Sequence, residues 1–298
     1  MQVLSAAETG GLNLYRRGKV RDTFQLSDGT LLMIATDRLS AFDVVLPTPI
    51  PGKGTVLTQM SRWWFGQTSG IMRNHLLPDV ETEIPEPVRN DWLPRSMHVA
   101  RAQRIDVECV VRGFISGSGW KEYREKGTLA GEPLQEGLRD SSRLPSPRFT
   151  PAIKKDDGHD INISRQELRT LVGQKLADDL ESASLRLFNV ATARCESVGI
   201  YLADTKFEFG YVDGALTLID EIFTPDSSRF WEISEWREGA PAVSFDKQFV
   251  RDYVETLGWD KTDPGPALPV HVVRGTTQRY VEAARRICSI DLSGIIAE

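Results

Sequence analysis

The alternation of hydrophobic and polar residues predicts two β-hairpins. RDTFQLS and TLLMIATD lie on either side of Asp28-Gly29, and KFEFGYV and ALTLIDEIF lie on either side of Asp213-Gly214. Each run is rich in residues that favour strands, and an Asp-Gly pair between two such runs favours a tight turn. We therefore expect one antiparallel hairpin near the N-terminus and a second in the last third of the chain.

One helix and two loops are predicted in the first half. Apolar residues recur every three or four positions over 56–72, and Thr55 or Thr58 is suited to begin the helix. Its tryptophans fit a hydrophobic core better than a binding platform. The proline-rich stretches 47–54 and 144–160 are predicted as loops, and the length of the second favours a binding role.

The second half predicts a helical region and then two amphipathic helices. Ser164 and Glu167 have the spacing of a capping box, and apolar residues then recur at helical spacing up to residue 202. One long helix and two shorter helices both fit this region. From Phe245 the pattern predicts two amphipathic helices joined by a Pro-Gly linker, which would close the fold. Together the elements indicate an α+β fold class.

Composition limits the class of protein. The 298 residues suggest two domains or one large domain with an appendage, and 40% hydrophobic with 26% charged residues is typical of a globular protein. The apolar runs are far shorter than the roughly 18 residues of a membrane span, and the N-terminus lacks the pattern of a secretory signal. We therefore expect a cytoplasmic protein without a membrane partner. A net charge of −6 disfavours nucleic acid as a partner.

The cysteines favour reduced, buried thiols. Cys109, Cys195 and Cys288 are far apart, and none forms a CxxC pair. A catalytic cysteine would need a basic partner such as His98 or His159, and the apolar ECVV segment around Cys109 argues against that role. The spacing of Cys and His residues also does not match a zinc site.

A glycine with basic neighbours, RRGKVRDTF, precedes the first hairpin strand. Gly18 would let backbone amides approach a phosphate, while Lys19 and Arg21 supply positive charge. The segment matches neither a Walker A motif nor GxGxxG. A phosphate site and a solvated basic turn therefore both fit it.

The second hairpin carries the strongest candidate chemistry. Lys206 and Glu208 share one face of their strand because side chains alternate, and Asp220 interrupts the apolar run of the opposite arm. Two carboxylates beside a lysine would suit magnesium and phosphate, since magnesium favours carboxylate oxygens together with substrate phosphates. A surface ladder of opposite charges is the alternative.

Three further segments contain candidate anion-binding residues. In ECVVRGFISGSGW an apolar strand leads to Arg112 and a Ser-Gly loop, which could hold an anion or form a simple glycine-rich turn. In KKDDGHD, His159 could act as a base, as a ligand or as a structural residue. In TPDSSRFW, Arg229 could hold a phosphate or a carboxylate.

Taken together, these motifs resemble those of the SAICAR synthetase family. The resemblance runs from about residue 15 to 235 through GKVRD, ATDRLSAFD, IPGKG, ECVVRGFISGSGW, KKDDGHD, DTKFEFG and LIDEIFTPDSSRFW, in that order. The extended ISGSGWKEY and the chain length are similar to the long form of the family. The last sixty residues carry little of the signal.

The resemblance implies a two-lobed fold related to ATP-grasp enzymes and protein kinases, with ATP in the cleft. Residues 1–106 would form a β-rich nucleotide-binding lobe, and residues 107–298 a larger lobe that holds the imidazole ribonucleotide CAIR and includes C-terminal helices over 245–298. The implied cofactors are ATP and Mg²⁺. The nucleotide would contact the glycine turn and the connector over 101–106, and magnesium would bind two carboxylates. These positions are Gly18, Lys19, Val20, Arg21, Arg104, Ile105, Asp106, Glu208 and Asp220.

The resemblance also implies a set of substrate-binding residues. The positions around CAIR are Arg112, Ser116, Ser118, His159, Asp160, Lys206 and Arg229. Four more residues, in the TDRLSAFD and PGKG loops, are expected to close over the reaction centre on the basis of their position in those loops alone. They are Asp37, Arg38, Ser40 and Lys53.

The implied reaction is ATP + CAIR + L-aspartate giving SAICAR + ADP + phosphate, through an acyl phosphate of CAIR. A carboxylate is a poor acyl donor, and phosphorylation gives it a leaving group before the aspartate amine attacks. Lys206 and Arg229 would stabilise charge, and Asp220 would position the metal. The alternatives are a small-molecule kinase of similar fold and a nucleotide-binding module without turnover. The sequence lacks the HRD and DFG motifs of protein kinases.

Overall fold

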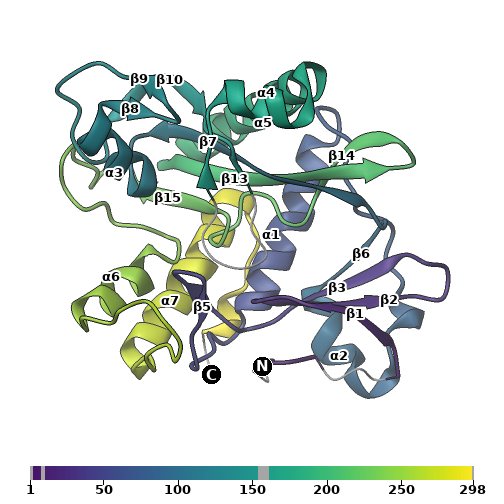
Figure 1. Cartoon of the computed structure of the whole chain (residues 1–298). Helices are drawn as coiled ribbons and strands as arrows, with labels where there is room; N and C mark the ends of the chain where they lie inside the picture. The colour runs from purple at the N-terminus through teal and green to yellow at the C-terminus, as the bar shows by residue number, and fades with distance from the viewer. Residues whose placement is uncertain (1–2, 8–10, 154–160, 297–298) are drawn as a thin grey trace.

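Two antiparallel sheets form the framework of the protein (Figure 1). The computed structural model describes residues 3–7, 11–153 and 161–296. The smaller sheet has the strand order β1-β2-β3-β6. The larger sheet follows the path β12-β11-β7-β13-β14, with β10 added on β7 and β15 on β13. The predicted α+β fold class is confirmed.

The strands come from well-separated parts of the chain. The smaller sheet contains β1 (Asn13–Arg17), β2 (Arg21–Gln25), β3 (Leu31–Ala35) and β6 (Ser96–Val99). The larger sheet contains β7 (Gln103–Phe114), β10 (Arg143–Phe149), β11 (Ala152–Ile153), β12 (Ile161–Asn162), β13 (Ile200–Val212), β14 (Ala215–Ile219) and β15 (Ser228–Glu232). Two small hairpins are formed by β4 (Ser40–Ala41) with β5 (Val44–Val45) and by β8 (Thr128–Leu129) with β9 (Glu132–Pro133).

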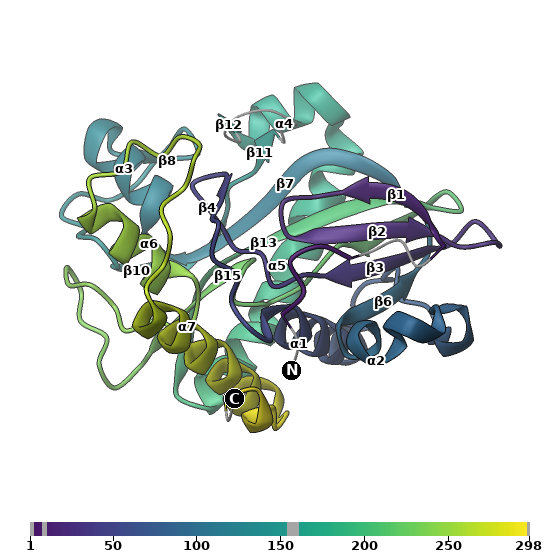
Figure 2. The same ribbon diagram turned by 90° about the horizontal axis from the view of Figure 1, so that it is seen from below.

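Helices cover the sheets and fill the space beside them. They are α1 (Lys53–Thr68), α2 (Arg89–Trp92), α3 (Gly117–Lys126), α4 (Arg165–Val172), α5 (Gln174–Ser197), α6 (Gln248–Thr256) and α7 (Val270–Ala283). Short 3-10 turns span Glu81–Glu83, Glu86–Val88, Leu93–Arg95 and Ser293–Ile295, and a π turn spans Ala284–Cys288. Helix α1 contacts β3 and β6 and runs beside α7 (Figure 2), while α5 packs on β13 and β7.

Both predicted hairpins are confirmed, and strand alternation in each separates the core from the site. β2 pairs with β3 and β13 pairs with β14, each across its Asp-Gly turn. In β2, Phe24 stacks on Trp92 with ring centroids 5.0 Å apart, while Arg21 lies on the opposite face. In β13, Phe207 is fully buried, whereas Glu208 is half-buried and faces a cavity. Arg21 and Glu208 therefore lie on the site-facing sides of the hairpins, while Phe24 and Phe207 pack in the core on the opposite sides.

The predicted helix over 56–72 begins earlier than expected. The N-cap of α1 is Gly52, which has a left-handed φ of 75°, so the helix starts before Thr55 and Thr58. Gly54 lies against β3 so closely that an added Cβ would be 2.1 Å from the carbonyl oxygen of Ala35. Close packing on a strand thus sets the start of α1, and no side-chain cap is present.

The helical regions of the second half match the predictions, except that β13 begins at Ile200, inside the segment predicted as helical. The capping box of Ser164 and Glu167 is present, and Gly173, with a φ of 86°, separates α4 from α5, so the region contains two helices. The two amphipathic C-terminal helices are α6 and α7. They form a hydrophobic cluster with the N-terminal segment 39–50, made of Leu39, Ala41, Leu46, Ile50, Val250, Val254, Leu268 and Val272.

The prediction of a loop over 144–160 is wrong for its first part. Residues up to Phe149 form β10, and Ala152–Ile153 form β11. Pro145 and Pro147 fit in β10 because this strand pairs with β7 alone, and proline is tolerated where no neighbour needs its missing N–H. Residues 154–160 lie outside the described residues.

The cysteine thiols are free and buried. Desolvation raises the pKa of each thiol, to about 12 for Cys288, so none is a reactive thiolate near neutral pH. Within the described ranges, no helix is long and apolar enough to cross a membrane.

Gly54→Ala is expected to destabilise the protein, because the new methyl group would overlap the carbonyl of Ala35 and push α1 away from β3. The expected loss is about 1–3 kcal/mol of unfolding free energy, measured by urea denaturation. The matched control is Gly66→Ala in the same helix, where a Cβ meets nothing within 4 Å. That change should stabilise the helix by about 0.5–1 kcal/mol. Equal effects of the two variants would contradict this account.

Candidate functional site

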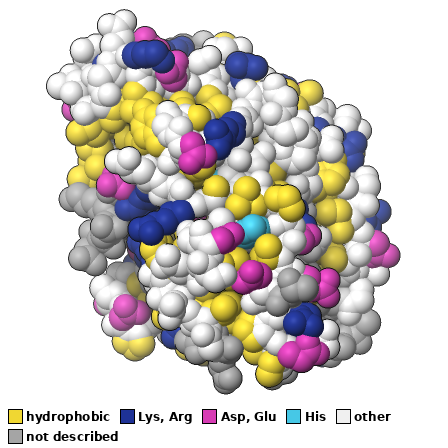
Figure 3. All heavy atoms as spheres, turned by 90° about the vertical axis from the view of Figure 1, so that its right-hand side faces the viewer, with side chains coloured by type: hydrophobic (Ala, Val, Ile, Leu, Met, Phe, Trp, Pro, Cys, Tyr) yellow, Lys and Arg dark blue, Asp and Glu magenta, His cyan; other side chains and the backbone are white. Residues whose placement is uncertain are grey.

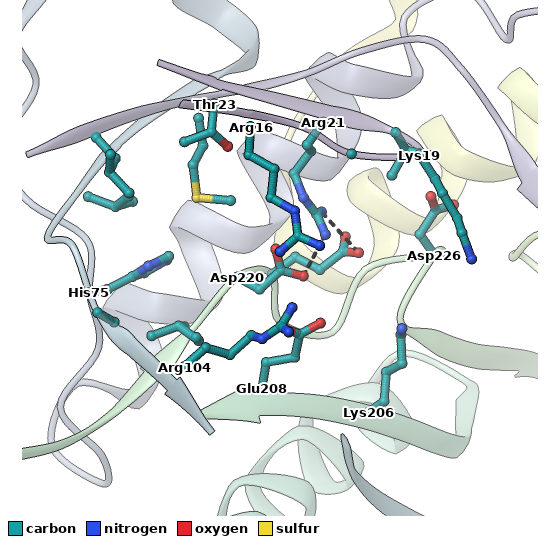
Figure 4. A pocket seen from close by; sticks show the side chains of 18 of the residues that line it. Arg16, Lys19, Arg21, Thr23, His75, Arg104, Lys206, Glu208, Asp220 and Asp226 are labelled. Atoms are coloured by element: carbon teal, nitrogen blue, oxygen red, sulfur yellow. Dashed lines mark hydrogen bonds and ion pairs between the residues drawn. The ribbon is translucent and has the colours of Figure 1, made fainter. Parts of the chain in front are cut away.

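A cavity of about 390 Å³ lies between the two sheets. Such a volume is typical of small-molecule sites. Strands β1–β3 form one wall, and β7, β13 and β14 form the other (Figure 4). The cavity collects nine of the residues predicted from sequence. These are Gly18, Lys19, Val20, Arg21, Ser40, Arg104, Lys206, Glu208 and Asp220.

One end of the cavity is apolar. Leu31, Met33, Val99 and Ile219 line it, together with His75. Burial lowers the pKa of His75 to about 4, so its ring is neutral at pH 7 and adds no charge. In Figure 4, His75 lies at the opposite end from Lys19 and Lys206. This end can hold a flat, weakly polar group.

The other end of the cavity is polar and carries lysines paired with carboxylates. Lys206 Nζ is 2.9 Å from Glu108 Oε1, and Lys19 Nζ is 2.7 Å from Asp43 Oδ1. Burial opposes the charge of Lys206, but Glu108 and Glu208 outweigh it and raise its pKa, so the ammonium persists. On the face of the molecule that Figure 3 shows, basic and acidic side chains are interspersed, with one cluster of Lys and Arg.

Arg21 connects the two walls of the cavity. Its Nη2 is 2.5 Å from Asp220 Oδ2, and its Nη1 is 3.1 Å from Glu221 Oε1. Burial lowers the pKa of Arg21, but Asp220 and then Glu221 outweigh this effect and hold the pKa above its ordinary value. The guanidinium from the smaller sheet therefore fixes the carboxylates of the larger sheet.

Glu208 and Asp220 are suited to a magnesium ion. Glu208 pairs in register with Ile219, the last residue of β14, and Asp220 follows directly. Glu208 and Asp220 both line the cavity. Asp220 has a left-handed φ of 68°, a strained conformation of the kind that clusters at functional sites. Magnesium commonly uses one or two carboxylates plus phosphates and water. The pair fits that ion, although no group of three or more ligands occurs in the described residues.

A second cluster joins residues predicted to bind CAIR. Asp204 Oδ2 accepts hydrogen bonds from Arg229 Nη1 at 2.5 Å, from Ser116 Oγ at 3.2 Å and from Arg112 Nη1 at 3.4 Å. Arg112 Nη2 also donates to Ser118 Oγ at 3.0 Å. Burial would raise the pKa of Asp204, but the two arginines lower it, so it is a carboxylate. Two forked cations thus converge on one anion and can bind another.

The Ser-Gly segment after β7 is a helix start, and the interpretation of it as a loop is wrong. Ser116 is the N-cap of α3, and Gly117 follows with a φ of 55°. The positive φ favours glycine, and a Cβ on Gly117 would be 2.6 Å from Arg229 Nη2, so a larger residue would displace the end of that side chain. The glycine therefore serves the arginine cluster directly.

Asp204 was not predicted, although a signal for it exists. It lies two and four residues before Lys206 and Glu208 in DTKFEFG, so strand alternation puts all three on one face. Asp226 and Lys247 were also not predicted, and both line the cavity. They lie in irregular segments, where no periodicity could indicate their direction.

Some predicted residues support the cavity from outside it. Asp37 is fully buried, accepts a hydrogen bond from Gly54 N and lies 2.9 Å from Arg95 Nη1. Arg38 donates to the carbonyl oxygens of Gly18 and Lys19, each at 2.9 Å, and so holds the glycine turn. These contacts give Asp37 and Arg38 a structural role in this conformation.

The remaining predicted residues differ in their placement. Lys53 is buried with its Nζ 2.8 Å from Asp226 Oδ2, behind the cavity wall. In the connector, Arg104 lines the cavity, while Ile105 packs on the hydrophobic core and Asp106 forms an ion pair with Arg104 at 2.7 Å. His159 and Asp160 lie outside the described residues.

Comparisons with known proteins agree on one family. The sequence matches the family described as SAICAR synthetase over residues 14–266. The phosphoribosylaminoimidazole-succinocarboxamide synthases of Desulfosudis oleivorans and Thermodesulfovibrio yellowstonii are each 49% identical to the chain, covering 95% and 94% of it and 97% and 96% of themselves. The solved SAICAR synthase of Saccharomyces cerevisiae complexed with SAICAR is 36% identical, with a TM-score of 0.88 over 97% of this chain and 99% of its own.

Asp204→Asn is expected to lower the unfolding free energy by about 3–5 kcal/mol, because Arg112 and Arg229 would lose the charge that compensates them. Urea denaturation at pH 7 measures the loss. The control is Asp179→Asn on the surface of α5, where the carboxylate pairs only with an exposed lysine and should contribute less than about 1 kcal/mol. An Asp204→Asn variant as stable as the control would contradict the buried ionic cluster.

Proposed function

The chain belongs to the SAICAR synthetase family, and on this premise we propose how its residues divide the work of the reaction. It is a ligase of purine biosynthesis. The proposed substrates are ATP, CAIR and L-aspartate, and the products are SAICAR, ADP and phosphate. The observation that best supports this assignment is the row of Asp204, Lys206 and Glu208 on one face of β13, because it connects the arginine cluster to the nucleotide-sized cavity.

ATP is assigned to the cavity between the sheets. Its base would lie at the apolar end near Met33 and Val99, and its phosphates would lie beneath the turn of Gly18 and Lys19. A glycine turn lets backbone amides approach phosphate oxygens. The magnesium ion is assigned to Glu208 and Asp220, where it would neutralise charge on the phosphates.

CAIR is assigned to the arginine cluster. Arg112 and Arg229 present forked donors that match phosphate and carboxylate groups, and Ser118 lies beside them. The yeast relative was solved in complex with SAICAR, which supports a ribonucleotide ligand for the family fold. His159 and Asp160 are kept as part of the proposed site on the resemblance alone, and Ser40 and Lys53 on their position in the loops.

The chemistry requires charge stabilisation more than covalent catalysis. Lys206 lies between the carboxylates of the cavity and Asp204 of the arginine cluster, so its ammonium can neutralise a phosphoryl group that passes from ATP to the CAIR carboxylate. Arg229 would neutralise negative charge on the CAIR carboxylate, which accepts the phosphoryl group. The amine of aspartate would then displace phosphate from the acyl phosphate.

The boundary between the two lobes and the cytoplasmic location of the protein are part of the same proposal. The boundary near residue 106 falls within β7, and the first lobe carries the glycine turn. A cytoplasmic location accords with a substrate set of free nucleotides. The two-lobed arrangement would let the walls of the cavity close on ATP.

The overall assignment is tested by ADP release with ATP, magnesium and CAIR, with and without aspartate. Over many turnovers, a ligase releases ADP only when aspartate is present, and in proportion to the SAICAR formed. A small-molecule kinase would release ADP without aspartate, and a binding module would release none. Either of those results would overturn the assignment.

Asp220→Asn is expected to reduce turnover by about 100-fold or more while nucleotide binding stays measurable, because the change removes a magnesium ligand and leaves the apolar end intact. Turnover is measured by ADP release, and binding by calorimetry with ADP. Asp213→Asn, at the exposed tip of the same hairpin, is the matched control and should keep full activity. Unchanged turnover in Asp220→Asn would remove this residue from the site.

Arg112→Ala is expected to raise the KM for CAIR by about 10-fold or more and to change the KM for ATP little, because a charge-assisted bond to the ribonucleotide would be lost. Initial rates at varied concentrations of each substrate separate the two effects. Arg112→Lys keeps the charge and loses the forked donors, so its KM for CAIR should lie between those of the wild type and Arg112→Ala. Equal increases in both KM values would place Arg112 outside the CAIR site.

A further inference from the structure

Lys247 is a cavity residue without a role in the proposed site. It lines the cavity together with Lys206 and Asp226, and it is the N-cap residue of α6. Its neighbour Asp246 accepts a hydrogen bond from the backbone N–H of Phe230 at 3.0 Å, beside Arg229. Lys247 therefore lies where the cavity and the arginine cluster meet.

The surroundings of Lys247 disfavour an ammonium ion. Among the described residues, the charged groups with the largest effects on it are Asp226 from the loop before β15, Arg251 from α6, Lys206 from β13 and Lys53 from α1. Three of these four groups are cations. The N-terminal end of a helix also carries partial positive charge, which adds to the same effect.

The single opposing carboxylate is shared with other partners. Asp226 Oδ2 is 2.8 Å from Lys53 Nζ, and Asp226 Oδ1 accepts a hydrogen bond from Tyr280 Oη at 2.7 Å. Burial, followed by the cations, outweighs the attraction of Asp226 and lowers the pKa of Lys247 to about 8. Near pH 7 about a tenth of Lys247 is thus a neutral amine, far more than for a lysine with an ordinary pKa.

Two lysines of one cavity are driven in opposite directions. Lys206, beside Glu108, has a raised pKa and stays an ammonium ion, while the pKa of Lys247 is lowered. Groups in one site whose environments push their pKa values apart commonly divide the tasks of charge stabilisation and proton transfer. Lys206 suits the first task, and a neutral lysine suits the second.

We propose that Lys247 is the general base that accepts a proton from the amino group of the entering amino acid at the junction of the cavity and the arginine cluster. This inference rests on the proposed ligase function, which leaves the acceptor of that proton unassigned. It also gives the amino acid a location, next to Lys247.

The step balances without another reactant. The ammonium group of aspartate gives one proton to Lys247 Nζ, and the freed lone pair forms the C–N bond to the acyl carbon of the acyl phosphate. The bond between that carbon and the phosphate oxygen breaks, and phosphate leaves with the bonding electrons. The second proton of the attacking nitrogen goes to the departing phosphate, and Lys247 returns its proton to solvent.

The test compares two nucleophiles in Lys247→Arg, which keeps a cation of similar length that cannot deprotonate. Aspartate must lose a proton before it attacks, whereas hydroxylamine is uncharged near neutral pH and needs no base. With aspartate, the single-turnover rate of the variant should fall by about 100-fold, a common contribution of a general base. With hydroxylamine, which would give the hydroxamate of CAIR, the variant should match the wild type. Lys175→Arg on the exposed face of α5 is the control.

Each outcome of this comparison supports or overturns the proposal. An equal loss with both nucleophiles would give Lys247 a binding or charge role, and full activity with aspartate would remove it from the reaction. If the wild-type protein releases no CAIR-dependent ADP with either nucleophile, the proposed function itself fails. The wild-type rate with aspartate should also rise with pH through about 8, because the base must be neutral, and the rate with hydroxylamine should not.

Arg251→Gln gives a second, independent measurement. Arg251 lowers the pKa of Lys247, so its removal should move the rise in the aspartate rate to higher pH while the plateau rate is kept. No hydrogen bond within the described residues depends on the Arg251 side chain, and the fold should tolerate the change. A pH profile that does not move would contradict the assignment of that rise to Lys247.

Discussion

The ion pair of Arg21 with Asp220 and Glu221 determines how the two sheets meet. Arg21 and Asp220 are 199 residues apart in sequence, and their contact joins the two walls of one cavity. A guanidinium can lie there only because two carboxylates compensate its loss of hydration. Asp220 is also a proposed magnesium ligand, so Arg21 and the ion would share its carboxylate. The ion pairs of Arg21 thus link the two walls of the cavity at the proposed magnesium site.

The larger sheet arranges the site along a single strand. Because side chains alternate, Asp204, Lys206 and Glu208 all leave the same face of β13, about 7 Å apart from one to the next. Asp204 orients two arginines, Lys206 carries a persistent positive charge, and Glu208 faces the nucleotide end of the cavity. Phe207 and Phe209 anchor the opposite face in the core beneath α5. Rigid support of this kind keeps reacting groups in register.

Local patterns were sufficient for the hairpins, the capping box and the C-terminal helices, because each depends on residues close in sequence. These patterns failed where tertiary packing decides where an element begins or which residues it tolerates. The start of α1 depends on the contact of Gly54 with β3, and the prolines of β10 fit only because that strand is at an edge. In the site, alternation could have identified Asp204. The position of Lys53 depends on Asp226, which approaches from a distant loop, and the lowered pKa of Lys247 depends on burial and on cations from other elements. Sequence spacing carries no signal for either.

The packing of α6 and α7 on residues 39–50 ties the end of the chain to the mouth of the cavity. Ser40 and Asp43, which line that mouth, belong to the small hairpin of β4 and β5, and the C-terminal helices support this hairpin from behind. Ile295 lies directly over Gly52 at the start of α1. A ribosome-bound chain that still lacks this tail would therefore carry every motif of the family without Lys247 and without the helices that support β4 and β5.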